Sequence, residues 1–371
     1  MTWAQVSARR LRRQGLVEPV GGDTPAGVVA AMCGAHAQVM AAAELSVAMR
    51  LDGVTRTGVR RALWEERSLV KTHGPRGTVH LLPARDLPMW VGAMSAIPHS
   101  NGFSESVRLT PEQTDAVVSA IRQVVDGVEL TIDELSDAVI AATGPWAGDL
   151  VMPAFQTMWP RWRQVMHVAA HRGAFVFGPA RGRKVTYTSP PDGFAPAGGR
   201  DDLVRAYLHA YGPATPADFA LWAGAPKTWA TAAFAAVELE EVRVAGRPGW
   251  VLAGDTDLPD EPPRGVRLLP YFDAYVVAGR PRDLLFPGEA ATRALARGQA
   301  GNHQVLLVDG TAAGVWHQRR SGTRIEVTVE PLRELTPGRL RELDTQVARL
   351  GEIMEGRPSL TIGRVTVGPH A

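Results

Sequence analysis

Apolar positions recur along the chain in the same order three times. In each copy, segments with helical spacing precede two short alternating segments that predict a β-hairpin. The first copy starts at Thr24 and Pro25, because a threonine side chain can cap a first helical turn and proline is tolerated there. Its predicted helices span about 24–33, 38–51 and 57–66, and its hairpin spans 68–82. This is the order of a winged helix-turn-helix, in which the third helix and the wing face DNA.

The second and third copies repeat this order without repeating the sequence. The second starts at Thr110-Pro111, and a capping box follows at Thr131-Ile132-Asp133-Glu134. Its remaining elements are an apolar helix over about 155–170 and a hairpin of 173–178 and 184–188. The third copy has helices at about 201–211, 215–222 and 227–236, and a hairpin of 239–244 and 249–252.

A different pattern follows an acidic, proline-rich stretch at 255–263. Strands are predicted at 265–270, 305–309, 311–317, 324–329 and 359–367, with a polar helix at 337–354. The chain thus divides into units of 1–95, 96–195, 196–254 and 264–371.

Composition narrows the class of protein. The 371 residues are 45% hydrophobic and 21% charged, which is typical of a folded chain with several cores. No apolar run reaches the roughly 20 residues that span a bilayer, and no secretory signal follows the N-terminal arginines. The single cysteine, Cys33, excludes an intramolecular disulfide, so we expect a cytoplasmic protein without a membrane partner.

The charge is uneven. The net charge is only +2, but residues 1–85 carry 12 basic and 6 acidic side chains, which favours phosphate contact by the first unit. A GC-rich genome is an alternative cause, because 37 of the 40 basic residues are arginine. The candidate DNA contacts lie in the third predicted helix or at hairpins: Arg56, Arg60, Arg61, Lys71, Arg76, Arg181, Arg183 and Lys184. For any one of them a solvated surface role is the alternative.

The sharpest chemical candidate is His36 with Gln38, which are placed where the first helix meets the second. At such a junction the two side chains can converge on one water molecule, although two residues apart on a helix they would not. The alternative is that both side chains cap the adjoining helix ends.

Five segments in order resemble the winged-helix DNA-binding family that contains the AlkZ/YcaQ-type alkylpurine DNA glycosylases, from about Val6 to Leu335. The segments are Gly34-Ala35-His36-Ala37-Gln38, Arg76-Gly77-Thr78-Val79-His80-Leu81-Leu82-Pro83, Tyr211-Gly212-Pro213-Ala214-Thr215-Pro216-Ala217-Asp218-Phe219, Leu268-Leu269-Pro270-Tyr271-Phe272-Asp273, and Val308-Asp309-Gly310 with Gly314-Val315-Trp316. The resemblance implies an α+β fold of three tandem winged helix-turn-helix modules, closed by a small C-terminal β-barrel-like domain.

The resemblance also implies a site. Family members of known activity carry Gln-x-Gln or Gln-x-Asp where this chain has His36-Ala37-Gln38, so Gln38 matches the second position and His36 replaces the first glutamine. A purine alkylated at N7 or N3 is a cationic leaving group, and the enzyme must then place a water at the sugar. Gln38 can orient that water, and a neutral His36 can accept its proton or position it. Because no lysine lies within about thirty residues of His36, we expect a monofunctional glycosylase that uses water and no cofactor.

Three other candidates have structural alternatives. Asp273 could stabilise positive charge at the sugar or fix the C-terminal domain to the scaffold. His73 and His80 flank the first hairpin turn and could contact DNA or bond within the hairpin. Cys33 and His36 have metal-ligand spacing, but without a second cysteine we expect no metal.

The sequence therefore predicts a monomeric base-excision repair enzyme acting on double-stranded DNA that carries alkylated purines. Small alkyl groups, bulky adducts and crosslinks all remain possible substrates, as do general repair and genotoxin self-resistance. The alternative is a non-catalytic winged-helix DNA-binding or regulatory protein.

Overall fold

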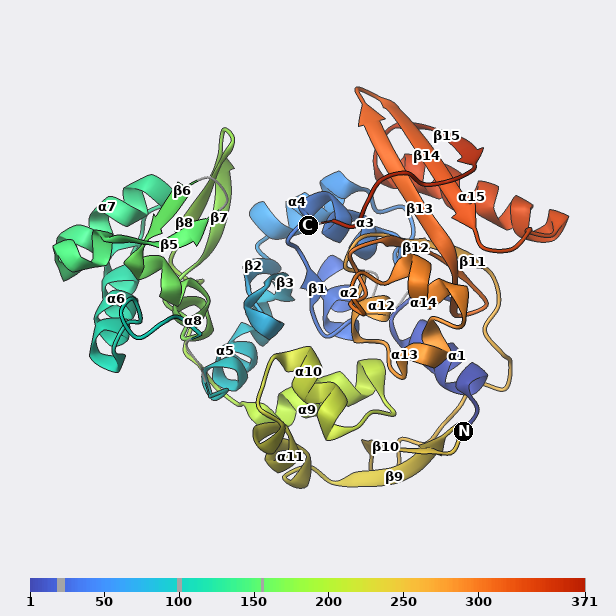
Figure 1. Cartoon of the computed structure of the whole chain (residues 1–371), viewed down its shortest axis with the longest axis horizontal. Helices are drawn as coiled ribbons and strands as arrows, with labels where there is room; N and C mark the ends of the chain where they lie inside the picture. The colour runs from blue at the N-terminus through green and yellow to red at the C-terminus, as the bar shows by residue number, and fades with distance from the viewer. Residues whose placement is uncertain (19–23, 99–101, 155–156, 371) are drawn as a thin grey trace.

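The computed structural model describes residues 1–18, 24–98, 102–154 and 157–370. The architecture is a mixed α+β fold, as predicted. The first unit (blue) lies centrally, with the second (green), the third (yellow) and the C-terminal part (orange to red) around it (Figure 1).

The first unit combines helices with a three-stranded sheet of order β1-β3-β2. Its elements are α2 (Pro25–Ala31), β1 (Ala35–His36), α3 (Met40–Ala48), α4 (Arg56–Trp64), β2 (Leu69–His73), η1 (Pro75–Gly77), β3 (Val79–Pro83), η2 (Ala84–Asp86) and α5 (Leu87–Ser95). The predicted capping by Thr24 is confirmed, since its hydroxyl accepts from the Gly27 amide at 3.1 Å. The helix predicted from residue 38 begins only at Met40, so Gln38 lies before it.

Helix α1 (Trp3–Arg13) precedes these elements in the chain and was not predicted. It begins with a capping box of Thr2 and Gln5, a signal that the sequence does carry. Its Leu11 is buried in the core of the C-terminal part, so the two ends of the chain pack together.

The second unit contains a mispredicted segment. Its elements are α6 (Pro111–Val124), β4 (Leu130–Thr131), α7 (Ile132–Thr143), η3 (Pro145–Gly148), β5 (Leu150–Ala154), β6 (Thr157–Pro160), η4 (Arg161–Val165), α8 (Met166–His171), β7 (Val176–Arg181) and β8 (Lys184–Thr188). The apolar helix predicted over 155–170 is wrong: β6, η4 and the short α8 occupy 157–170, and 155–156 lie outside the described residues. The helix start predicted at Thr110-Pro111 and the capping box predicted at Thr131 are both confirmed.

The third unit matches its predicted order. It contains α9 (Arg200–Tyr211), α10 (Pro216–Ala223), α11 (Lys227–Ala235) and the hairpin of β9 (Leu239–Val244) and β10 (Arg247–Leu252).

The C-terminal part is built on a five-stranded sheet of order β11-β12-β13-β14-β15. Its elements are β11 (Val266–Leu269), α12 (Ala274–Ala278), α13 (Arg282–Leu285), α14 (Glu289–Ala294), β12 (Gln304–Val308), β13 (Thr311–Ser321), β14 (Arg324–Pro331), α15 (Pro337–Ile353) and β15 (Arg357–Ile362). The pairs are antiparallel except β14 with β15, which is parallel and is joined through α15. In the part of the chain that the structure describes, β11 and β15 do not pair, so the sheet is a half-barrel and not a closed barrel.

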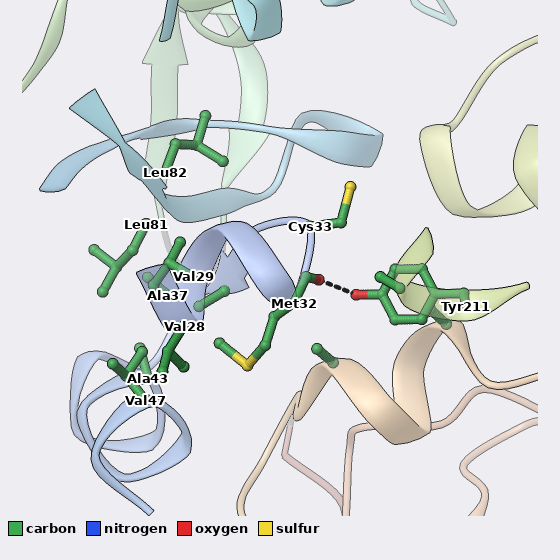
Figure 2. Close-up of a cluster of buried hydrophobic side chains, with 14 of the residues drawn as sticks. Val28, Val29, Met32, Cys33, Ala37, Ala43, Val47, Leu81, Leu82 and Tyr211 are labelled. Atoms are coloured by element: carbon green, nitrogen blue, oxygen red, sulfur yellow. Dashed lines mark hydrogen bonds between the residues drawn. The ribbon is translucent and has the colours of Figure 1, made fainter. Parts of the chain in front are cut away.

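The core of the first unit fixes β1 in place (Figure 2). Val28 of α2 and Met32, which caps the end of that helix, are fully buried among apolar residues from β3 and α3, and Tyr211 of α9 donates a hydrogen bond to the Met32 carbonyl. Burying each large apolar side chain contributes about 1.5–3 kcal/mol, so the strand that carries His36 rests on a rigid base.

Within the described ranges, no helix is both long and apolar enough to cross a bilayer.

Candidate active site

The path from α2 into β1 requires a glycine. Cys33 and Gly34 both have positive φ, at 52° and 90°, and a Cβ on Gly34 would lie 3.2 Å from the Leu82 side chain. This tight turn brings the chain back along β3, where His36 pairs directly with His80. The β1–β3 pairing therefore fixes where the His36 side chain emerges.

The His36 imidazole is held on two sides. Its ring stacks on Phe272 with centroids 4.4 Å apart, and the His80 ring lies edge-on at 5.1 Å. The backbone N–H of Gln38 donates to His36 Nδ1 at 3.4 Å, so Nδ1 is an acceptor and the neutral ring carries its proton on Nε2.

Burial keeps this imidazole neutral. It lowers the pKa of His36 to about 3, and the charges of Arg76 and His370 act in the same direction. A group with so low a pKa is a weak base at neutral pH, so His36 is poorly suited to accept a proton there.

Gln38 is exposed and sits beside the same strand. Its Oε1 accepts from the Val79 amide at 3.5 Å, which directs the carboxamide over the start of β3. Helix α2 ends at Ala31 with Met32 as its C-cap, α3 begins after its N-cap Val39, and no side-chain hydrogen bond caps α3. The alternative that His36 and Gln38 cap these helices is therefore absent from the described geometry.

His36 faces a cavity of about 330 Å³ between the first unit, the third unit and the C-terminal part. The described residues that line it include exposed or half-buried apolar side chains, one acid and three arginines, and none is a lysine. They are His36, Arg76, Thr78, Asp218, Leu221, Trp222, Phe272, Val277, Ala278, Arg280, Arg282, Gly298, Gln299, Ala300 and Asn302.

The three arginines make the cavity electropositive. Burial lowers the pKa of Arg76 and Arg282, and the Arg280 charge lowers both further. Arg76 donates to the Trp222 carbonyl at 2.5 Å, and Arg282 donates to the Val277 carbonyl at 2.6 Å. Within the described part of the chain, no hydrogen bond or ion pair engages the Arg280 guanidinium, which leaves it able to bind a phosphate.

Sequence reasoning identified Arg76 but missed Arg280 and Arg282. Arg76 reaches the cavity because its turn packs on the end of α10, where a Cβ on Gly224 would lie 2.9 Å from the Arg76 Cα. Arg280 and Arg282 follow α12 and are about 240 residues from His36 in sequence, so no local pattern connects them to it.

The other predicted DNA contacts lie outside this cavity and mostly in ion pairs. Arg56 and Arg60 both reach the fully buried Glu44 carboxylate, at 3.5 and 2.6 Å. Arg61 pairs with Glu66, Arg181 with Glu134 and Lys184 with Asp133. The Lys71 amine lies 5.2 Å from the Phe177 ring centre, and Arg183 is exposed at the β7–β8 turn.

The two hairpin histidines bond within their own hairpin. His73 Nδ1 lies 2.8 Å from the Gly77 carbonyl, and His80 Nδ1 lies 2.9 Å from the Thr78 carbonyl. Burial lowers the pKa of both. These bonds favour the structural alternative for His73, whereas His80 also contacts the His36 ring.

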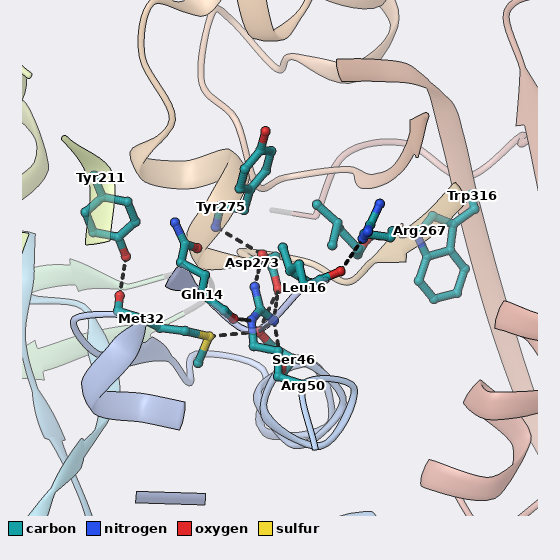
Figure 3. Close-up of polar contacts among 11 residues, drawn as sticks. Gln14, Leu16, Met32, Ser46, Arg50, Tyr211, Arg267, Asp273, Tyr275 and Trp316 are labelled. Atoms are coloured by element: carbon teal, nitrogen blue, oxygen red, sulfur yellow. Dashed lines mark hydrogen bonds and ion pairs between the residues drawn. The ribbon is translucent and has the colours of Figure 1, made fainter. Parts of the chain in front are cut away.

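Asp273 is fully buried and joins the first unit to the C-terminal part (Figure 3). Both its oxygens accept from Arg50 at 2.9 Å, and one also accepts from the Ser46 hydroxyl at 2.7 Å. The other oxygen caps α12 through the Tyr275 amide at 3.0 Å. Asp273 does not line the cavity, so its contacts favour the fixing role over a charge beside the sugar.

Cys33 is buried as a free thiol. Among the residues that can be described, no group of three or more His, Cys, Asp or Glu side chains could hold a metal ion.

The lowered pKa of His36 predicts a pH-dependent stability. Between about pH 3 and pH 6.5 the unfolded chain binds a proton at His36 that the folded chain does not, so stability is lost as the pH falls below 6.5. His36→Gln lacks this proton and should not lose stability in this way. The free energy of unfolding of the wild type minus that of the variant should therefore fall by about 2 kcal/mol between pH 7 and pH 5. Urea unfolding of both proteins at both pH values measures this difference. If the difference is the same at pH 7 and pH 5, the His36 imidazole is not held neutral by burial.

Comparisons with known proteins define the class to which this site belongs. The chain is similar to the "Interstrand DNA cross-link repair glycosylase" of Streptomyces sahachiroi, with 32% identity over 336 residues that cover 85% of this chain and 87% of the relative. The solved structure of the Streptomyces sahachiroi DNA glycosylase AlkZ matches 98% of this chain and all of that chain, with a TM-score of 0.79 and 28% identity. The class is therefore DNA glycosylase, an enzyme that hydrolyses N-glycosyl bonds in DNA. Residues 29–353 match the family "DNA glycosylase AlkZ-like", and the chain belongs to that family.

Proposed function

We propose that this glycosylase releases purines alkylated at N7 or N3 from double-stranded DNA, with His36 and Gln38 holding the attacking water. The observation that carries the proposal is the opening of the His36 side chain onto the arginine-lined cavity, with the Gln38 carboxamide, two residues further on, bonded to the Val79 amide at the start of β3. The His36 Nε2–H and the side-chain NH2 of Gln38 offer donors, and the side-chain oxygen of Gln38 offers an acceptor. Together they can orient one water for attack on the oxocarbenium-like sugar.

The reaction is proposed to be monofunctional. The cavity lining holds no lysine among its described residues, and the Met1 amine is bonded to the Arg243 carbonyl at 2.8 Å in the third unit. A Schiff base would need one of these amines at the sugar, so water is the proposed nucleophile.

Bulky adducts and interstrand crosslinks are included in the proposed substrate range. The relative named above is called a cross-link repair glycosylase, and the cavity here is bordered by apolar side chains. Leu221 is 58% exposed there, beside Trp222 and Phe272. Such a surface can receive a large apolar lesion that an enclosed base pocket would reject.

The three helix-and-hairpin units are proposed to be winged helix-turn-helix modules that hold the duplex as a monomeric scaffold. Arg280 is the proposed phosphate ligand of the cavity, because no hydrogen bond or ion pair engages its guanidinium among the described residues. Arg56, Arg60, Arg61, Arg181 and Lys184 would have to exchange their ion pairs for phosphates.

A panel of lesions tests the proposal. Duplexes with N7-methylguanine, N3-methyladenine, a bulky N7 adduct or a nitrogen-mustard crosslink are incubated with the protein, and abasic sites are revealed by heating in alkali. Base release without strand cleavage before alkali is expected for at least one lesion. Tight binding with no release from any lesion would favour a non-catalytic DNA-binding role.

His36→Gln should keep base release within about tenfold of wild type, because glutamine can also hold a water through its amide. His36→Leu, of similar size but without a polar atom, should lose roughly 100-fold or more. Single-turnover rates on the best lesion of the panel measure both. A rate for His36→Leu close to that of wild type would contradict the water-holding role.

A further inference from the structure

The segment that follows β15 returns to the candidate active site. The Gly363 amide donates to the Val329 carbonyl at 2.9 Å. Val365 is buried; its amide donates to the Glu330 carboxylate, and its carbonyl accepts from the Arg293 guanidinium. Beyond this anchor, residues 366–369 are exposed, and His370 donates its amide to the Asn302 carbonyl at 2.7 Å. In Figure 1 this dark red segment leaves β15 and ends over the middle of the molecule.

His370 meets an aromatic cluster there. Its ring lies 5.5 Å from that of Phe272, edge to face at 80°, and 5.2 Å from that of Tyr271. Phe272 in turn stacks its face on the His36 imidazole. One ring therefore separates the end of the C-terminal segment from the site residue of the first unit.

Phe272 is held in an unfavourable backbone conformation. Its φ is +57°, which is rare for an aromatic residue, and its amide bonds to the Gly301 carbonyl at 2.9 Å. Glycine is required at position 301, which faces Phe272, since a Cβ there would lie 3.1 Å from the Phe272 ring and 2.9 Å from the Val277 side chain. Such strain persists only where the surroundings fix it, and it concentrates at functional sites.

We propose that Phe272 and His370 are positioning residues for His36, so that the C-terminal segment completes the active site. Phe272 fixes the plane of the imidazole. In this orientation Nδ1 accepts from the Gln38 backbone N–H, and Nε2 is turned toward the cavity. His370 supports Phe272 through its edge-to-face contact with the ring. The inference rests on the proposed role of His36, and it adds that the site does not exist in the first unit alone.

The first readout is the ionisation of His36, which does not depend on the reaction. The groups around the imidazole are His80 from β3, Arg76 from η1 and His370 from the C-terminal segment, and Asp218, Arg280 and Arg282 line the same cavity. Removing the Phe272 ring admits water to His36 without removing a charge. In Phe272→Ala the His36 pKa should therefore rise from about 3 toward 6.5, measured by NMR on the resonance that His36→Gln lacks.

The second readout is the rate of base release. Phe272→Ala should lower the single-turnover rate by roughly 10- to 100-fold with little change in DNA affinity, because misplacing a positioned group costs rate more than binding. Phe272→Tyr keeps the ring and should restore both rate and pKa. A chain truncated after Val365 keeps its anchor and should move both readouts in the same direction as Phe272→Ala.

Two controls separate positioning from general damage. Phe286→Leu alters a buried ring of the C-terminal core that does not touch His36, and Val367→Ala alters an exposed side chain of the same segment. Neither should move the His36 pKa. If Phe272→Ala and the truncation leave the pKa and rate of wild type, or if Phe286→Leu moves both equally, the proposal is overturned. If wild type releases no base but Phe272→Ala still raises the His36 pKa, the positioning stands and the proposed function fails.

Discussion

Replacing Gln38 with alanine is expected to lower the single-turnover rate of base release by about 100-fold or more. The carboxamide is exposed at the start of β3 and can act on a water as both donor and acceptor, whereas alanine can do neither. The fold should be unaffected, because exposed substitutions away from caps and cores change stability by only about 0.5 kcal/mol. The rate is measured with enzyme in excess over lesion DNA, beside a thermal melt of the same preparation.

Two further variants make this prediction specific. Gln123→Ala removes an exposed glutamine from α6 in the second unit and should keep the wild-type rate. Gln38→Asp keeps an acceptor on the water and should lie between wild type and Gln38→Ala. A Gln38→Ala rate within about threefold of wild type would remove Gln38 from the mechanism, since a positioned water-holding group contributes far more than that.

Helix starts were predictable because capping is local. The hydroxyls of Thr24, Thr110 and Thr131 each accept from a backbone amide three residues ahead, as the sequence indicated. The same chemistry at Thr2 marks α1, so that helix could have been found. Strand pairing in the hairpins was also predictable, because it joins segments close in sequence.

The segment over 155–170 was mispredicted because short apolar runs have no unique period. Met158 and Trp159 belong to β6, whereas Trp162 and Val165 lie in η4 and are buried against α6 and α7. Apolar spacing records only which side chains are buried, and the pairing of β6 with β5 decides that the backbone is extended.

The part of the candidate site that lies in one short segment could be predicted, and the part contributed by the C-terminal residues could not. His36 and Gln38 stand two residues apart, so a single short segment contained the signal. Phe272, Arg280 and His370 reach the same place only through the packing of the C-terminal part on the first unit. Conversely, Arg60 and Arg61 looked available to DNA because sequence does not show the carboxylates of Glu44 and Glu66 that bind them.

That packing depends on one buried ion pair, so Asp273→Ala is expected to have the largest effect on stability. The Asp273 carboxylate and the Arg50 guanidinium are both fully buried, and the variant leaves the arginine uncompensated. We expect a loss of about 3–5 kcal/mol in the free energy of unfolding, measured by urea denaturation. Asp283→Ala is the matched control: it breaks an exposed pair with Arg247 and should cost less than about 1 kcal/mol.

The same variant separates the two interpretations of Asp273. Asp273 joins α12 to the end of α3 through its bonds to Ser46 and Arg50, and it does not line the cavity. The Asp273→Ala protein that remains folded at low temperature should therefore release base at a rate near that of wild type. Replacing both partners, Arg50→Met with Asp273→Leu, should recover much of the stability, since an apolar pair leaves no charge buried. A folded Asp273→Ala protein with wild-type stability and a rate lowered roughly 100-fold would instead assign the carboxylate to the chemistry at the sugar.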